Sequence, residues 1–205
     1  MFRPPPSPQT TSSNRPPHPP HPTGSVATGG FVSAFGTRCY RIADVDALPP
    51  FFLSLASASD LWAFLTSTGA LTAGRVDAEN NFFAYQSVDR LYDEVGHSGP
   101  VTTLFVDGPA GPAVWRPFAP LLRRDPQLRR HLYKSIEGDR VWFEEEHLGL
   151  DLIFRAGWST AARHGLVRTC ELANLGTAPV SVRLLDVLLN LQPSGLPRRL
   201  QDTSS

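Results

Sequence analysis

From Phe31 onward the chain is a series of short apolar runs separated by turns rich in glycine and proline, and this spacing constrains its fold most strongly. Runs of roughly four to eight residues that alternate in polarity are typical of β-strands and too short for most helices. Strands are predicted over residues 51–57, 60–67, 101–106, 113–118, 132–136, 140–147, 165–175 and 180–190. This spacing favours an all-β, mainly antiparallel fold whose sheets pack face to face.

Turn chemistry predicts how these strands connect. Hairpins are expected at Thr68-Gly69, 108–112, 137–139 and 176–179, because glycine and proline suit the special backbone angles of tight turns. In the run 60–67 both alternating faces are apolar, so we expect this strand to be covered on both sides.

The stretch around residue 130 carries the only helix signal. Asp125-Pro126 offers an N-cap oxygen followed by proline, and 127–133 could form two helical turns. This stretch is also the most basic, with arginines at positions 123, 124, 129 and 130. We interpret them as a solvated, salt-bridged surface in preference to a phosphate site, because no glycine-rich loop accompanies them.

Residues 1–30, the Pro-rich leader, differ from the rest of the chain. Nine of the twenty prolines lie before Thr23, and Arg3 and Arg15 are the only charged residues. With little apolar surface to bury, the leader is predicted to be disordered with polyproline II character. Its PxxP pieces could dock on an aromatic groove, but an unstructured leader is the preferred interpretation. The β-sandwich domain is assigned to residues 31–205.

Composition limits the function classes. The 205 residues suffice for one domain, and 41% hydrophobic with 19% charged residues fits a globular protein. A formal net charge of zero makes no electrostatic case for a nucleic acid or membrane partner. Cys39 and Cys170 are expected to be reduced strand or core residues. No secretory signal or membrane-length apolar run is present, so a cytoplasmic location is expected.

The run Glu144-Glu145-Glu146 is the main candidate for catalysis. On a strand, Glu144 and Glu146 share a face, with roughly 6.5–7 Å between their Cα atoms. This distance is compatible with the separation of the two carboxyl groups in inverting glycosidases, about 6.5–9.5 Å. A general acid needs an apolar pocket, whereas three adjacent glutamates are expected to form a hydrated strand face. The sequence has no nucleophile elbow, zinc-protease motif, P-loop or dinucleotide fingerprint, and no metal site or cofactor is predicted.

Aromatic residues are the better lead to a binding function. The tryptophans and Tyr85 could stack on the apolar faces of sugar rings, although Trp115, Trp142 and Trp158 are expected mostly to pack in the core. Hydrogen-bonding residues, Arg75, Asp77, Asn80 and Asn81, lie between Trp62 and Tyr85. The predicted carbohydrate-binding residues are Trp62, Arg75, Asn80 and Tyr85.

Three stretches carry a family resemblance. SDLWAFLTSTGALTAGR at 59–75, DAENNFFAY at 77–85 and LYKSIEGDRVWFEEE at 132–146 resemble the N-terminal β-sandwich region of cellobiose-phosphorylase-like glycoside phosphorylases. The resemblance implies a galactose-mutarotase-like β-supersandwich followed by a helical barrel. In such enzymes the barrel supplies the catalytic acid and most of the phosphate site, and inorganic phosphate attacks with inversion. No catalytic residue of the family can be placed on this chain.

The expected function is therefore that of a structural and carbohydrate-binding N-terminal domain of a glycoside phosphorylase-like enzyme. Long stretches with helical periodicity are missing, so we expect the helical barrel to be absent from this chain. The chain is expected to be a truncated N-terminal part, with an incomplete sandwich that is inactive without a helical-barrel partner. An oligosaccharide or sugar phosphate is the expected ligand, and a homodimer is a further expectation. Two alternatives stay open, a stand-alone carbohydrate-binding β-sandwich and a glycosidase that uses Glu144 and Glu146.

Overall fold

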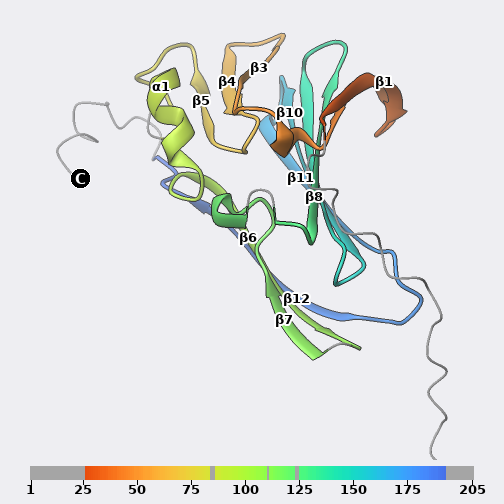
Figure 1. Cartoon of the computed structure of the whole chain (residues 1–205). Coiled ribbons are helices and arrows are strands. Elements are labelled where there is room, and N and C mark those ends of the chain that lie inside the picture. The colour runs from red at the N-terminus through yellow and green to blue at the C-terminus, as the bar shows by residue number, and fades with distance from the viewer. Residues whose placement is uncertain (1–25, 84–85, 110, 123–124, 193–205) are drawn as a thin grey trace, which may run out of the picture.

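The computed structural model describes residues 26–83, 86–109, 111–122 and 125–192, and its strands and short helices follow one another as in Figure 1. Most of the Pro-rich leader and the predicted site residue Tyr85 lie outside the described residues. The first strand begins at Thr28, slightly before the predicted start of the domain at Phe31.

Strands dominate the described chain. They are β1 (Thr28–Ala34), β2 (Thr37–Ala43), β3 (Phe52–Leu55), β4 (Leu61–Thr66), β5 (Leu71–Arg75), β6 (Gly99–Gly108), β7 (Gly111–Trp115), β8 (Leu128–Ser135), β9 (Arg140–His147), β10 (Leu152–Ala161), β11 (Gly165–Asn174) and β12 (Ser181–Leu189). The helical pieces are short: α1 (Val88–Leu91) and the 3₁₀ turns η1 (Val45–Ala47), η2 (Tyr92–Glu94) and η3 (Pro120–Leu122). No helix in the described ranges is long and apolar enough to cross a membrane.

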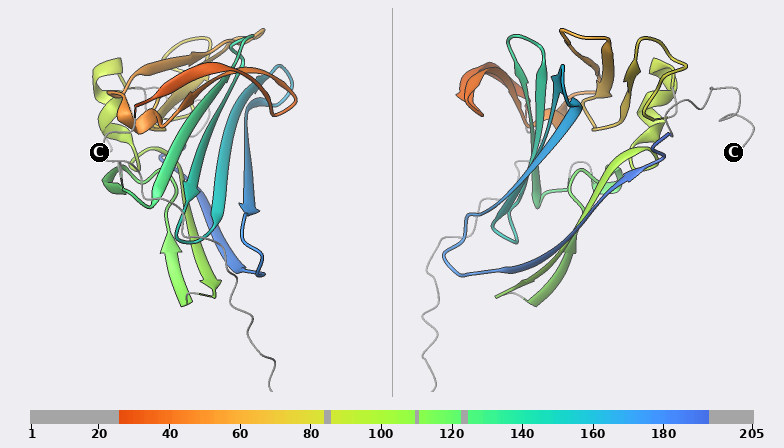
Figure 2. Two further views of the ribbon diagram at one scale, coloured as in Figure 1. Left: turned by 45° about the vertical axis from the view of Figure 1, so that its right-hand side comes forward. Right: turned by 180° about the vertical axis from the view of Figure 1, so that it is seen from behind.

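Three open antiparallel sheets form the molecule. The largest has the order β1-β2-β8-β9-β10-β11, and two three-stranded sheets have the orders β12-β6-β7 and β3-β4-β5. The two small sheets lie at different places along the large one, as the two views in Figure 2 show. The predicted all-β, mainly antiparallel sandwich is confirmed.

Both small sheets pack against the same face of the large sheet. Leu132, Val141 and Phe143 of the large sheet form a core with Leu65 and Leu71 of the β3-β4-β5 sheet. A second core joins Leu152 and Phe154 to Leu104 and Trp115 of the β12-β6-β7 sheet. Alternate residues of β9 and β10 thus point inward, among them Val141, Phe143, Leu152 and Phe154.

Three predicted hairpins are confirmed. The turn at Thr68-Gly69 joins β4 to β5, with Gly69 at φ +96°, a conformation that glycine adopts without a Cβ clash. Gly138, at φ +78°, closes the β8–β9 hairpin, and its N–H donates to the Ser135 carbonyl at 3.0 Å. The 108–112 turn joins β6 to β7.

The predicted helix at 127–133 is wrong, because these residues belong mostly to β8. Asp125 does cap a backbone N–H, since its side chain accepts from the Gln127 N–H at 2.8 Å, but the turn leads into a strand. Leu128, Arg130 and Leu132 point inward at the strand period and pair with β9. Tertiary pairing therefore overrides the local capping signal. The short α-helix lies instead at 88–91.

The predicted hairpin at 176–179 is also wrong. β11 pairs with β10 in the large sheet, whereas β12 pairs with β6 in a small sheet. The local turn does form, since the Asn174 side chain donates to the Ala178 carbonyl and accepts from the Gly176 N–H. A turn fixes the local backbone but not which sheet the next strand joins.

Candidate functional site

A row of three aromatic rings lies on the outer face of the β3-β4-β5 sheet. Phe52 on β3 lies 5.3 Å from Phe64 on β4, and Phe64 lies 5.8 Å from Trp62, between ring centroids. Leu61, Ala63 and Leu65 fill the inner face of β4 and are buried, while Trp62 and Phe64 are half-buried. The predicted double-sided cover of this strand is therefore only partial, and the aromatic row keeps some access to solvent.

Gly74 allows Trp62 to lie close against β5. Trp62 and Gly74 face each other in the β4–β5 register. A Cβ placed on Gly74 would lie 2.5 Å from Trp62 Cζ2, 2.6 Å from the Asn80 carbonyl oxygen and 2.8 Å from Asn81 Cα. Real Cβ atoms do not approach so closely, so only glycine lets the indole ring and the following loop meet here.

The loop 77–80 forms a polar rim beside Trp62. The Trp62 indole Nε1–H donates to the Asp77 carbonyl at 3.1 Å. The Asp77 side chain accepts from the Glu79 N–H at 3.0 Å and from Asn80 Nδ2 at 2.8 Å. Asp77, Glu79 and Asn80 are exposed. Aromatic surface next to ordered, exposed hydrogen-bonding groups is the combination that suits a sugar ring.

The other two predicted site residues have different positions. The Arg75 N–H donates to the Asn80 carbonyl at 2.8 Å, but its side chain follows the inner-face alternation of β5. That side chain forms an ion pair with Asp60 at 2.7 Å, away from the aromatic row. Tyr85 lies outside the described residues. Trp62 and Asn80 are thus brought together, and the backbone N–H of Arg75 helps to hold the loop that carries Asn80.

Two site-forming residues were missed by the sequence reasoning. Phe52 and Phe64 complete the aromatic row, although neither was named as a binding candidate. The alternation in 60–67 was the available signal, because it places Phe64 on the same face as Trp62. Of the remaining tryptophans, Trp115 and Trp158 are in the cores as predicted, and Trp142 stacks on Phe35 at 4.6 Å.

Two of the three glutamates of β9 are buried and Glu146 is half-buried, which corrects the predicted hydrated face. Glu144 is 6% exposed and Glu145 is fully buried. Tyr133 donates its hydroxyl to Glu144 Oε1 at 2.9 Å, and Arg155 Nε donates to Glu144 Oε2 at 2.5 Å. Burial and the neighbouring Glu144 carboxylate raise the pKa of Tyr133 to about 12. The Glu144 carboxylate is therefore fully engaged by a phenol and a guanidinium.

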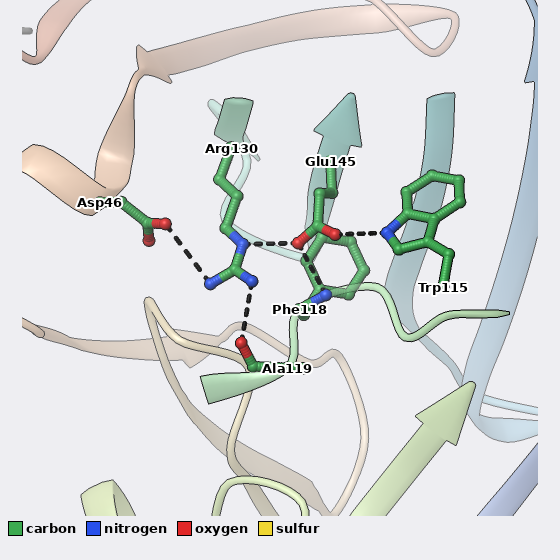
Figure 3. Close-up of polar contacts among 6 residues, drawn as sticks. All are labelled: Asp46, Trp115, Phe118, Ala119, Arg130 and Glu145. Carbon is green, nitrogen blue, oxygen red and sulfur yellow. Dashed lines mark hydrogen bonds and ion pairs between the residues drawn. The ribbon is translucent and has the colours of Figure 1, made fainter. Parts of the chain in front are cut away.

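Glu145 is the centre of a buried polar cluster on the inner face of the large sheet (Figure 3). Its carboxylate accepts from Trp115 Nε1 at 2.7 Å, from the Phe118 N–H at 2.7 Å and from Arg130 Nε at 2.5 Å. Arg130 also donates to the Ala119 carbonyl at 2.9 Å and lies 3.4 Å from Asp46. The cluster thereby joins the chain after β7, the η1 turn and the large sheet.

Burial governs the chemistry of this cluster. It raises the pKa of Glu145, and the opposing effects of Arg130, Trp115 and the Phe118 N–H only reduce the rise. Arg130 is 8% exposed, so its assignment to a solvated basic surface is wrong, while Arg123 and Arg124 lie outside the described residues. The buried ion pair Arg130–Glu145, whose carboxylate oxygens both accept hydrogen bonds, is therefore interpreted as a structural element and not as a reactive group.

The described part of the chain holds two free cysteines. There, no three His, Cys, Asp or Glu side chains gather closely enough to hold a metal ion. Cys39 is buried on β2 and Cys170 is exposed on β11, and both are free thiols. The aromatic row with its polar rim is the candidate functional site, because it joins ring surface to exposed hydrogen-bonding groups.

Comparisons with known proteins give no family for this chain. No model of a known protein family matches it, and no curated protein matches its sequence.

Proposed function

We propose that this β-sandwich is the structural and carbohydrate-binding N-terminal domain of a glycoside phosphorylase-like enzyme. The observation that carries the proposal is the aromatic row, Phe52, Phe64 and Trp62, next to the exposed polar loop 77–80. Flat aromatic surface binds the apolar faces of pyranose rings, and the polar rim satisfies their hydroxyls. The sequence resemblance to cellobiose-phosphorylase-like enzymes points to the same class of ligand. Phosphorolysis itself is assigned to a helical-barrel partner.

The charges of the rim favour a neutral oligosaccharide over a sugar phosphate. Asp77 and Glu79 are both exposed beside Trp62, and the nearby Arg75 side chain is already paired with Asp60. A phosphate at this rim would meet the carboxylates of Asp77 and Glu79, and the Arg75 guanidinium beside it is engaged by Asp60. Inorganic phosphate therefore belongs, in this proposal, to the whole enzyme and not to this site.

Calorimetric titration of the purified chain with a cello-oligosaccharide series tests the proposal. Because Trp62 would supply the stacking surface, Trp62→Ala should weaken binding by about tenfold or more, where each tenfold corresponds to about 1.4 kcal/mol. Trp142→Ala is the matched control, since Trp142 is half-buried in another sheet and should leave binding unchanged. A folded chain that binds none of these sugars, or equal effects of the two substitutions, would refute the proposal.

The glycosidase alternative depends on Glu144 and Glu146. A catalytic carboxyl must reach its substrate, but Glu144 is 6% exposed and its two oxygens already accept from the Arg155 guanidinium and the Tyr133 hydroxyl. This environment favours a structural carboxylate. Hydrolysis of oligosaccharides by the purified chain, abolished by Glu144→Gln, would restore the alternative.

A stand-alone binding module differs from an enzyme domain in its dependence on a partner. Both would bind oligosaccharides through Trp62, so binding alone does not separate them. The proposal predicts phosphorolysis of the bound sugar when a helical-barrel domain is supplied in trans, and none without it. Sugar binding with no activity in that mixture would favour the stand-alone module.

A further inference from the structure

The inner face of the β1–β2 hairpin carries an aromatic patch at the surface. Phe31, Arg38, Tyr40 and Ile136, here called the hairpin patch, line an open hollow of about 460 Å³. Phe31 is 62%, Ile136 53% and Tyr40 42% exposed. Single apolar side chains are ordinary on a protein surface, whereas several that gather at one place mark an interaction site.

The hairpin patch continues the core face of the large sheet. Tyr40 and Ile42 lie on one face of β2, and Ile42 packs against the first core. The β3-β4-β5 sheet reaches this face as far as Lys134, whose Nζ donates to the Ser54 carbonyl at 2.7 Å. Beyond that contact β1 and β2 lie at the outer edge of the large sheet, as Figure 1 shows. The patch is therefore a piece of core face with no opposing layer in the described part of the chain.

The rings of the hairpin patch are held in place. Phe31 and Tyr40 meet edge to face at 5.2 Å, and the Arg38 guanidinium lies 5.1 Å from the centre of the Phe31 ring. A Cβ on Gly29 would collide with the Tyr40 hydroxyl, so glycine is needed for Tyr40 to lie over β1. The patch is therefore a preformed surface that needs little ordering when a partner binds.

The shape of the hairpin patch is complementary to itself. Phe31 is the most exposed of its side chains and stands beside the hollow that it helps to line. In a two-fold dimer both copies present the same surface, so a group that protrudes next to a hollow meets the hollow of the other copy, twice. Two sheet faces that pack about 10 Å apart interdigitate their side chains in this way.

The charges of the patch are complementary to themselves as well. Arg38 lies within the patch, and Glu137 follows Ile136 at its rim and is exposed. The Ile136 N–H donates to the Arg38 carbonyl at 3.1 Å, which keeps the two charged residues on adjacent parts of the sheet. Within the described ranges neither side chain has an ion-pair partner. A two-fold axis brings each arginine to the glutamate of the other copy, because contacts across such an axis are reciprocal.

We propose that the hairpin patch binds the same patch of a second copy of this chain, face to face about a two-fold axis. Phe31 of each copy enters the hollow of the other, and Arg38 pairs with Glu137 of the partner subunit. Each hairpin thereby supplies the opposing layer that the other lacks at this edge of the sandwich. The interface is separate from the proposed sugar site, because the patch and the aromatic row belong to different sheets.

Analytical ultracentrifugation of the full chain over a wide range of concentration tests the proposal. The parent chain should pass from monomer to dimer as its concentration rises. Phe31→Asp brings a charge into the apolar hollow and should weaken association by about tenfold or more. Val114→Asp is the matched control, since Val114 is 66% exposed on β7 in another sheet and should leave association unchanged. A parent chain that stays monomeric throughout, or equal effects of the two substitutions, would overturn the proposal.

Charge reversal tests whether two copies meet through Arg38 and Glu137. In the proposed dimer Arg38→Glu sets carboxylates against each other and Glu137→Arg sets guanidinium groups against each other, so each variant alone should associate about tenfold more weakly or worse. An equimolar mixture of the two variants restores both ion pairs in a heterodimer and should associate as the parent chain does. A mixture that behaves like its separate components would overturn the proposal. Trp62→Ala should leave association unchanged, which separates a failure of this interface from a failure of the sugar site.

Discussion

Strands β4 and β9 both alternate inward-facing and outward-facing residues, but they differ in which side chains are buried. In β4 the inner face is aliphatic, and the outer face carries Trp62 and Phe64, which stay half-exposed. In β9 a charged residue, Glu145, occupies the inner face and is fully buried among Trp115, Phe118 and Arg130. Polarity along a strand therefore does not reveal which side chains meet solvent. The covering sheets decide that, and they leave aromatic surface open while enclosing charge.

Removing the arginine from the buried cluster should have the largest effect on stability. Arg130→Met leaves the Glu145 carboxylate buried without its cation, which typically costs about 3–5 kcal/mol. Urea denaturation at neutral pH measures this loss. The matched control is Arg129→Met, because Arg129 is the neighbouring arginine on the opposite face and is half-buried opposite Glu146. Equal losses in the two variants would contradict the role assigned to the cluster.

A double variant sharpens this test. Arg130→Met/Glu145→Met removes both charges, and replacing a buried pair by apolar residues is often neutral or better. We expect it to recover part of the loss of Arg130→Met, with the Trp115 and Phe118 N–H groups left as the remaining cost. A double variant that is less stable than Arg130→Met would show that the carboxylate stabilises the fold without its partner.

On β5, the close contact at Gly74 should show the next largest effect. Gly74→Ala places a methyl group against the Trp62 ring and the backbone of the 77–80 loop, and such overpacking costs about 1–3 kcal/mol. Oligosaccharide binding should fall with it, because the indole ring must move. Gly30→Ala on β1 is the matched control, since its Cβ meets nothing within 4 Å. Thermal unfolding that ranks the two variants the other way would refute this reading of Gly74.

The comparison also shows what the sequence can predict. Apolar alternation and turn residues located β9, β11, β12 and three hairpins, because both are local properties. The burial of Glu145 and the strand at 128–135 were not predictable locally, since both depend on Arg130 meeting β9 and on Trp115 arriving from another sheet. The same applies to Phe52, which joins the aromatic row only through the β3–β4 register.

Tyr133 gives a smaller, pH-dependent test on the outer face of the large sheet. Tyr133→Phe removes the hydrogen bond to Glu144 and should cost about 1.5 kcal/mol at neutral pH. The folded-state pKa of Tyr133 is raised from 10.0 to about 12, so its contribution is complete below pH 10 and is lost as the pH rises toward 12. The advantage of the parent chain over the Phe variant, measured by urea denaturation, should therefore shrink across that window. A constant difference would mean that the phenol is not held by Glu144.

The exposed ion pair between Arg75 and Asp60 should show the smallest effect. Both side chains keep about two-fifths of their surface, 40% and 43%, in contact with solvent, so water and salt screen the pair although the atoms are only 2.7 Å apart. Asp60→Asn should change the free energy of unfolding by less than about 1 kcal/mol, and about 1 M NaCl should abolish the difference. Arg130–Glu145 has a similar separation, 2.5 Å, but lies where solvent cannot reach. If Asp60→Asn lowered the free energy of unfolding as much as Arg130→Met, distance and not burial would set the strength of these ion pairs. The contrast between β4 and β9 would then lose its physical basis.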